Sequence, residues 1–192
     1  MGKFTLTALP VLGGFDQDYN GTRLRELVDL AAVAVSVPMD GANALAQAMK
    51  TAFGGDIPAV GQSYLSKDGS RIVGFAPDQM MVLFDHAPHS GVAAIEQKLG
   101  TEHGAVGYYV EQTNNWVTLE LDGPLARAAL ERLCALNLHP DSFVMDRAER
   151  TTMEHMGALV IRTGEDRFVL MGPSSMAGSF LHAITVSLEY VI

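Results

Sequence analysis

The chain has 192 residues, of which 48% are hydrophobic and 18% are charged. A chain of this length buries enough surface to fold without disulfides or metal, and its composition indicates a globular protein. Thirteen Lys and Arg stand against 22 Asp and Glu, so the net charge is −9. Without a basic cluster the chain cannot neutralise successive phosphates, and we expect no nucleic-acid partner.

Membrane insertion and export are also disfavoured. The longest apolar stretch, Leu30–Met39, is about ten residues long, roughly half of what a membrane helix needs. Polar positions interrupt the N-terminal residues too often for the apolar core of a signal peptide. Cys134 is the single cysteine, which excludes an intrachain disulfide and fits a reducing compartment. We therefore expect a cytoplasmic protein with no membrane partner.

The first half of the chain is predicted to hold an N-terminal arm and one folded unit. Residues 1–29 are punctuated by Gly and Pro and are expected to be irregular, with Thr22–Leu27 as the one candidate strand. Residues 30–112 predict a β-α-β-β-α-β unit, in which Asp40 is expected to cap the first helix. Its predicted strands are Leu30–Val37, Gln62–Ser66, Arg71–Phe75, Met80–Phe84 and Val106–Gln112.

Residues 113–192 repeat this order as a second, β-α-β-β-α unit. Pro124 opens its first helix, and Ser174 or Ser175 is expected to cap the last one. Two tandem units of the split-βαβ, ferredoxin-like kind predict an α+β fold. A sheet covered by helices on one face cannot bury its other face alone, so we expect the two units to pack together as one compact body. The predicted strands are Trp116–Leu121, Arg147–His155, Ala158–Arg162 and Phe168–Met171.

The chain lacks the patterns that mark a cofactor or catalytic site. It has no Gly-x-Gly-x-x-Gly fingerprint, Walker motif or Gly-x-Ser-x-Gly elbow. Asp85-His86 with His89 is its only histidine cluster, and this is weak support for a metal because structural zinc usually needs four ligands. His182 is expected to be a core histidine of the last helix. We predict no catalytic, cofactor-binding or metal-binding residue in this chain.

Four residues are candidates for a subunit interface: Trp116, His139, Arg150 and Glu154. The predicted strand 147–155 is polar on both faces. This fits either a solvated edge strand or a strand on which Arg150 and Glu154 pair across a subunit contact. Trp116, the single tryptophan, is either a core anchor or an interface hot spot. His139 precedes a proline, where a histidine is more often a turn residue bonded to backbone.

An ordered set of segments in the second half carries a family resemblance. These segments are Trp116–Arg127, Leu133–Phe143, Arg150-Thr151, Gly157–Arg162 and Pro173–Ala183. Together they resemble the gamma subunit of heterotetrameric sarcosine oxidase, closely over residues 105–188 and diffusely over 20–104. The resemblance implies the fold of the N-terminal part of the folate-binding aminomethyltransferases, which agrees with the tandem units.

The resemblance also implies a place in a larger enzyme that oxidatively demethylates sarcosine to glycine. Alpha, beta and delta subunits are expected as partners, with FAD, FMN, NAD, tetrahydrofolate and zinc bound on them and none on this chain. The aminomethyltransferases carry an acidic residue after a Gly-hydrophobic strand, whereas Gly157–Arg162 has no carboxylate. We therefore expect an assembly role without an active site. A free-standing folate-binding aminomethyltransferase-like protein and an unrelated acidic interaction module are the alternatives.

Overall fold

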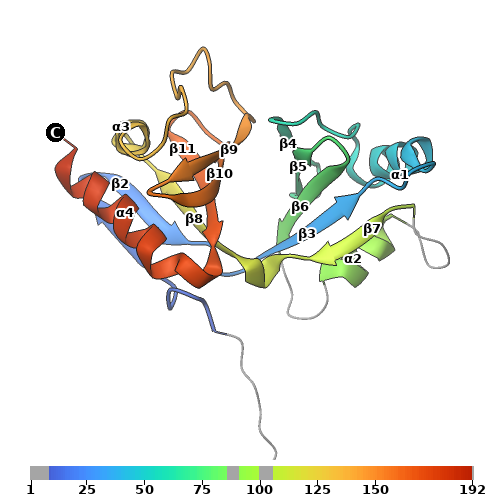
Figure 1. Ribbon diagram of the computed structural model, residues 1–192, viewed down its shortest axis with the longest axis horizontal. Coiled ribbons are helices and arrows are strands. Elements are labelled where there is room, and N and C mark those ends of the chain that lie inside the picture. Colours follow the sequence, from blue (N-terminus) through green and yellow to red (C-terminus); the bar gives the residue numbers. More distant parts are fainter. Residues whose placement is uncertain (1–8, 86–90, 100–105, 192) are drawn as a thin grey trace, which may run out of the picture.

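The computed structural model describes residues 9–85, 91–99 and 106–191. They form two antiparallel sheets with helices on the outer sides (Figure 1). The expected α+β class with two tandem split-βαβ units is confirmed. None of the helices in the described ranges combines the length and the apolar composition needed to cross a bilayer.

The five-stranded sheet has the strand order β4-β5-β6-β3-β7. Its strands are β3 (Leu30–Ser36), β4 (Ser63–Leu65), β5 (Arg71–Ala76), β6 (Gln79–Asp85) and β7 (Tyr108–Glu111). On β3, an interior strand between β6 and β7, Val33 faces the core below α1 (Ala42–Phe53) and α2 (Gly91–Lys98), whereas Ala32 faces the other sheet. Because both of its faces are buried, this strand is apolar at nearly every position.

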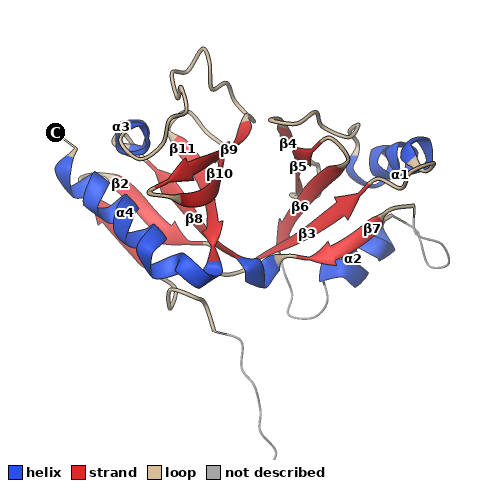
Figure 2. Ribbon diagram, in the orientation of Figure 1, coloured by secondary structure: helices blue, strands red, loops and turns tan. Residues whose placement is uncertain are grey.

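The six-stranded sheet has the order β1-β2-β8-β11-β10-β9. Helices α3 (Ala126–Glu131) and α4 (Ala177–Tyr190) cover its outer face, where Phe168 and Phe180 are fully buried (Figure 2). Two short 3₁₀ turns, η1 (Thr113–Asn115) and η2 (Ser174–Met176), precede β8 and α4. The strands are β1 (Asp16–Tyr19), β2 (Thr22–Glu26), β8 (Trp116–Asp122), β9 (Ala148–Met153), β10 (Met156–Arg162) and β11 (Arg167–Pro173).

The N-terminal segment departs from the irregular arm expected over residues 1–29. It forms the β1–β2 hairpin, in which Asn20 and Gly21 have the positive φ angles of a tight turn, 52° and 82°. β2 pairs with β8, and its Leu24 is fully buried. β2 thus lies beside β8 as β7 lies beside β3. The candidate strand Thr22–Leu27 is thus found as β2, whereas β1 and the pairing with β8 were not expected, because β1 is short and polar and the partner residues on β8 lie far along the chain.

The two sheets pack face to face, as expected. Backbone hydrogen bonds join them at one edge: Ser63 N–H donates to the Asp146 carbonyl (2.8 Å), and Ala148 N–H donates to the Gly61 carbonyl (3.1 Å). The unit boundaries, 30–112 and 113–192, stay a prediction. The apolar residues buried between the sheets are Ala32, Val73, Met81, Leu83, Ala148, Leu159, Ile161, Val169 and Met171.

The predicted caps of α1 and α4 are both wrong. The N-cap of α1 is Gly41, whose N–H donates to the Pro38 carbonyl at 3.0 Å, so a backbone turn starts the helix one residue after exposed Asp40. α4 begins after η2 with no side-chain cap. The Ser174 hydroxyl donates instead to the Asn114 carbonyl at 2.7 Å, because η1 brings that acceptor within reach.

Candidate subunit interface

The strand that carries Arg150 lies at the edge of the six-stranded sheet. β9 stands last in the strand order and pairs with β10. Ala148 and Met153 are buried at its two ends, whereas Arg150 and Thr152 are exposed. This arrangement agrees with the solvated-edge interpretation of the sequence. A contact with another subunit at this edge stays a prediction.

Glu154 and His155 form the two-residue turn between β9 and β10. Both have positive φ angles, 45° and 69°. Turns of this kind favour Asn-Gly, and a non-glycine residue in the left-handed region costs on the order of 1–3 kcal/mol. Backbone strain of this kind often marks a site where side-chain placement has a function.

Trp116 and Arg150 converge on Phe75 of the five-stranded sheet. The Phe75 and Trp116 rings meet edge to face, with their centres 6.2 Å apart. The Arg150 guanidinium lies 4.8 Å from the centre of the Phe75 ring. Trp116 packs against the core between the sheets, and its indole nitrogen is enclosed without a hydrogen-bond partner in the described part of the chain. Trp116 therefore packs as a core residue. Arg150 stays exposed and contacts the Phe75 ring from the surface.

A cavity of about 550 Å³, which we call the β9–β10 cavity, lies beside Trp116 and Arg150. Its lining offers one cation, two threonine hydroxyls, one amide and apolar side chains, but no acid–base pair. General acid–base chemistry needs two such groups in reach of a substrate, so the lining suits binding better than catalysis. The remaining lining residues are Asn115, Thr151, Thr152, Gly157, Ala158, Leu159 and Pro173.

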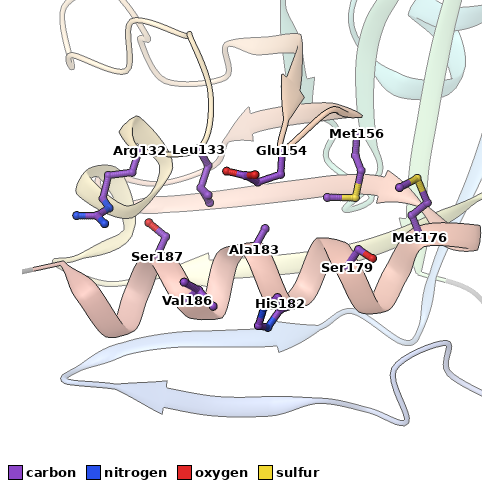
Figure 3. A pocket seen from close by; sticks show the side chains of 10 residues that line it. All are labelled: Arg132, Leu133, Glu154, Met156, Met176, Ser179, His182, Ala183, Val186 and Ser187. Atoms are coloured by element: carbon purple, nitrogen blue, oxygen red, sulfur yellow. The ribbon is translucent and has the colours of Figure 1, made fainter.

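A second cavity, about 520 Å³, runs along α4, and we call it the α4 groove (Figure 3). Glu154 lines it from the β9–β10 turn. His182 lines it from α4 and is exposed, so the expected core position of His182 is wrong. The reason is helical geometry: the buried face of α4 runs through Phe180 and Ile184, and His182 lies away from that face. The other lining residues are Arg132, Leu133, Met156, Met176, Ser179, Ala183, Val186 and Ser187.

His139 lines neither of these two cavities. Its side chain is 66% exposed. The Asp141 N–H donates to His139 Nδ1 at 3.4 Å, and the Phe143 N–H donates to the His139 carbonyl at 2.8 Å. His139 is thus a turn residue bonded to backbone. The structure brings Trp116 and Arg150 together, places Glu154 at the α4 groove and leaves His139 apart from both.

β10 ends in Arg162, a residue that the sequence analysis did not single out. Its side chain is almost fully buried. The guanidinium donates to the carbonyls of Phe143 (2.8 Å), Glu165 (3.0 Å) and Gly164 (3.1 Å), and also to Pro140. This strand, which has no carboxylate, therefore ends in a cation that joins two loops to the sheet. The sequence feature that could have identified this residue is an arginine at the end of an otherwise apolar strand.

The described residues include neither a candidate metal site nor an activated thiol. Within them, no group of three or more His, Cys, Asp or Glu could hold a metal ion, and His86 and His89 lie outside them. Cys134 is half-buried, and its thiol donates to the Leu130 carbonyl at 3.4 Å. Burial raises the pKa of this thiol, which keeps it protonated and poorly nucleophilic at neutral pH.

Two packed sheets of tandem split-βαβ units define the class of protein: this is the folate-binding aminomethyltransferase type of fold. Glycine cleavage system aminomethyltransferase T from Bartonella henselae superposes with a TM-score of 0.64 at 17% identity. The match covers 85% of this chain and 45% of that one. At this level of identity the likeness shows the fold alone.

The family model for the sarcosine oxidase gamma subunit matches residues 39–187, and the chain belongs to this family. Sarcosine oxidase subunit gamma from Arthrobacter sp is 32% identical over 152 residues, which is 77% of this chain and 70% of that protein. The subunit from Corynebacterium sp. strain P-1 is 30% identical over 164 residues, 83% and 76% of the two chains. The family resemblance in the sequence is confirmed.

A solved structure extends this relationship to an assembly. It is the heterotetrameric sarcosine oxidase from Corynebacterium sp. U-96 in complex with pyrrole 2-carboxylate. One of its chains matches with a TM-score of 0.74 at 25% identity. The match covers 92% of this chain and 89% of that one, so nearly the whole fold is shared.

Proposed function

We propose that this chain is the non-catalytic gamma subunit of a heterotetrameric, flavin- and tetrahydrofolate-dependent sarcosine oxidase, and that it serves in assembly. The observation that carries the proposal is the match to a chain of a heterotetrameric sarcosine oxidase along nearly the full length of both chains. The lining of the β9–β10 cavity supports an assembly role, because it pairs no acid with a base.

The partners in this proposal are alpha, beta and delta subunits, in the cytoplasm. FAD, FMN, NAD, tetrahydrofolate and zinc belong to those partners. In this chain Arg162 closes the strand after which the aminomethyltransferases carry an acid, and each of its three guanidinium nitrogens donates to a backbone carbonyl. That arrangement favours a scaffold over a folate-amine site.

Trp116, His139, Arg150 and Glu154 are the proposed interface residues. Arg150, Glu154 and His139 are exposed, and Glu154 is held by a strained turn. Trp116 contributes by fixing Phe75 and, through it, the exposed Arg150. Charged groups at the rim of such an interface steer association more than they add affinity.

Native mass spectrometry of the endogenous complex tests the proposal, because it reports partner chains and bound cofactors together. We expect this chain in a four-chain assembly whose flavin stays with the other chains. Flavin binding or sarcosine oxidation by the purified chain alone would contradict the proposal. The shared fold keeps one alternative in view, a free-standing aminomethyltransferase-like protein, and it predicts tetrahydrofolate binding by the isolated chain in titration calorimetry.

A further inference from the structure

Helix α4 has a second apolar stripe in addition to its core face. The core face runs through Ala177, Phe180, Ile184 and Leu188. The second stripe begins at Met176, the last residue of η2, and continues on α4 through Ser179, Ala183, Val186 and Tyr190, with alternating spacings of three and four residues. Met176, Val186 and Tyr190 are 44%, 36% and 64% exposed. A 3–4 spacing of apolar and small residues is the pattern by which one helix packs along another.

The α4 groove has a fixed wall beside this stripe. Figure 3 shows Leu133, just after α3, and Met156 of β10 on the same side of the groove, facing α4. Ser179 and Ala183 are small, so a backbone can approach the middle of the floor closely. The groove is pre-formed because α4 is bonded to α3: the Ser187 hydroxyl donates to the Ala129 carbonyl at 2.8 Å.

The groove is lined by charges of both signs: Arg132 lies at one end, where its guanidinium donates to the Tyr190 carbonyl (3.3 Å), and Glu154 lies over the middle. Figure 3 shows the Glu154 carboxylate between Leu133 and Ala183, directed over the floor. Among the residues that the structure describes, no ion pair holds this carboxylate. The turn that positions it is strained, and the chain as a whole carries a net charge of −9. A cationic side chain on the occupant would therefore pair with Glu154 and be steered towards this surface.

We propose that the α4 groove receives an amphipathic helix of a partner subunit, with its apolar face on the α4 stripe and a Lys or Arg beside Glu154. The inference rests on the proposed function, because the partner subunits of the oxidase supply the helix. The stripe from Met176 to Val186 corresponds to about three helical turns of the occupant. The ridge spacing of α4 selects a helix, since an added strand would need an unpaired strand edge that the groove floor does not offer.

The test uses the co-expressed complex and two matched substitutions, Val186→Arg in the groove and Val110→Arg on β7. Both valines are exposed, 36% and 52%, so neither change should alter the melting temperature of the isolated chain. We expect Val186→Arg to weaken assembly at least about tenfold, as for an interface hot spot, and Val110→Arg to leave it unchanged. Equal assembly of both variants, or equal loss in both, overturns the groove proposal. Failure of the unaltered chain to assemble overturns the proposed function itself.

The kind of occupant is tested by charge and by cross-linking. Glu154→Lys should weaken assembly about tenfold, and Glu154→Gln by less, because reversal repels the partner cation. A photo-reactive residue at Ser179 should cross-link to partner residues spaced three or four apart. Cross-links confined to an extended or loop segment of the partner, or full tolerance of Glu154→Lys, would rule out a cationic helix.

Discussion

The Arg150 guanidinium lies 4.8 Å from the centre of the Phe75 ring and so joins the edge strand of one sheet to the other sheet. The contact makes Arg150 part of the internal structure as well as an exposed candidate for a subunit contact. Phe75 in turn meets Trp116 edge to face. Phe75 of the five-stranded sheet therefore contacts both Trp116 and Arg150 of the six-stranded sheet.

Replacing Arg150 by Ala should lower the free energy of unfolding by about 0.5–1 kcal/mol, the usual value of an exposed cation–π contact. Urea denaturation of the isolated chain measures it. Arg150→Lys should retain part of the stability. A double-mutant cycle with Phe75→Leu should give a coupling energy of similar size; a coupling of zero would show that the ring contact contributes nothing.

Replacing Arg162 by Met should cost about 3 kcal/mol of unfolding free energy, because several buried carbonyls lose their donor. The side chain is 7% exposed and joins the Phe143 loop and the Glu165 turn to β10. Thermal or urea unfolding provides the measurement. The control is Arg23→Met, whose side chain is 55% exposed and pairs with Asp16, and whose cost should stay below about 1 kcal/mol. Similar losses in both variants would argue against a bracing role for Arg162.

The Asp68–Lys98 pair should make stability depend on acid pH. Burial by itself raises the pKa of Asp68, but hydrogen bonds from Lys98 and Ser70 outweigh it and hold the pKa at about 2, below the ordinary 3.8. A lowered folded-state pKa adds stability above pH 4, and this stability is lost as the pH falls from about 4 to 2.

The Asp68 and Lys98 side chains are each 34% exposed, so we discount this contribution to about 1 kcal/mol. Asp68→Asn should lose that amount at pH 7 and approach the unaltered chain near pH 2. Urea denaturation at several pH values compares the two proteins. A constant difference across this range would contradict the assignment.

Residues better suited to the strained β9–β10 turn should stabilise the protein. Glu154→Asn combined with His155→Gly supplies the residues that tolerate φ angles of 45° and 69°, and should raise the unfolding free energy by about 1 kcal/mol. The same variant should assemble less well if Glu154 contacts a partner. A gain in stability together with lost assembly would mark this turn as a place where stability is given up for binding. Reduced stability would show that the turn is not strained.

The sequence predicted those parts of the fold that repeat or have a clear period. The interior strand β3 was recognisable from its apolar run, and the face-to-face packing of the sheets followed from the need to bury a second sheet face. β2 was anticipated as a candidate strand, but β1 and the place of the hairpin beside β8 were missed, because that pairing is set by tertiary contacts, with Arg25 bonded to Glu120 across 95 positions. Local pattern carries no information about a partner at that distance.

The candidate site was predictable only as a set of residue types. Arg150 and Glu154 were identified as unusual charges on a polar strand, but they lie at different cavities, because one precedes the β9–β10 turn and the other belongs to it. His182 was assigned to the core from its neighbour Ile184. Because α4 carries apolar residues on two faces, the sequence pattern alone does not show which face is buried.

The N-terminal hairpin should be essential to the fold, and Leu24 tests this. Its side chain is fully buried in the core under α3 and α4. Leu24→Ala should therefore cost about 3 kcal/mol, from lost burial and the cavity left behind. Val28→Ala, two residues after β2 and 48% exposed, should cost less than about 0.5 kcal/mol. Urea unfolding of both variants distinguishes the outcomes. A small loss at Leu24 would mean that β2 is loosely attached, and a large loss that β2 is an integral strand of the six-stranded sheet.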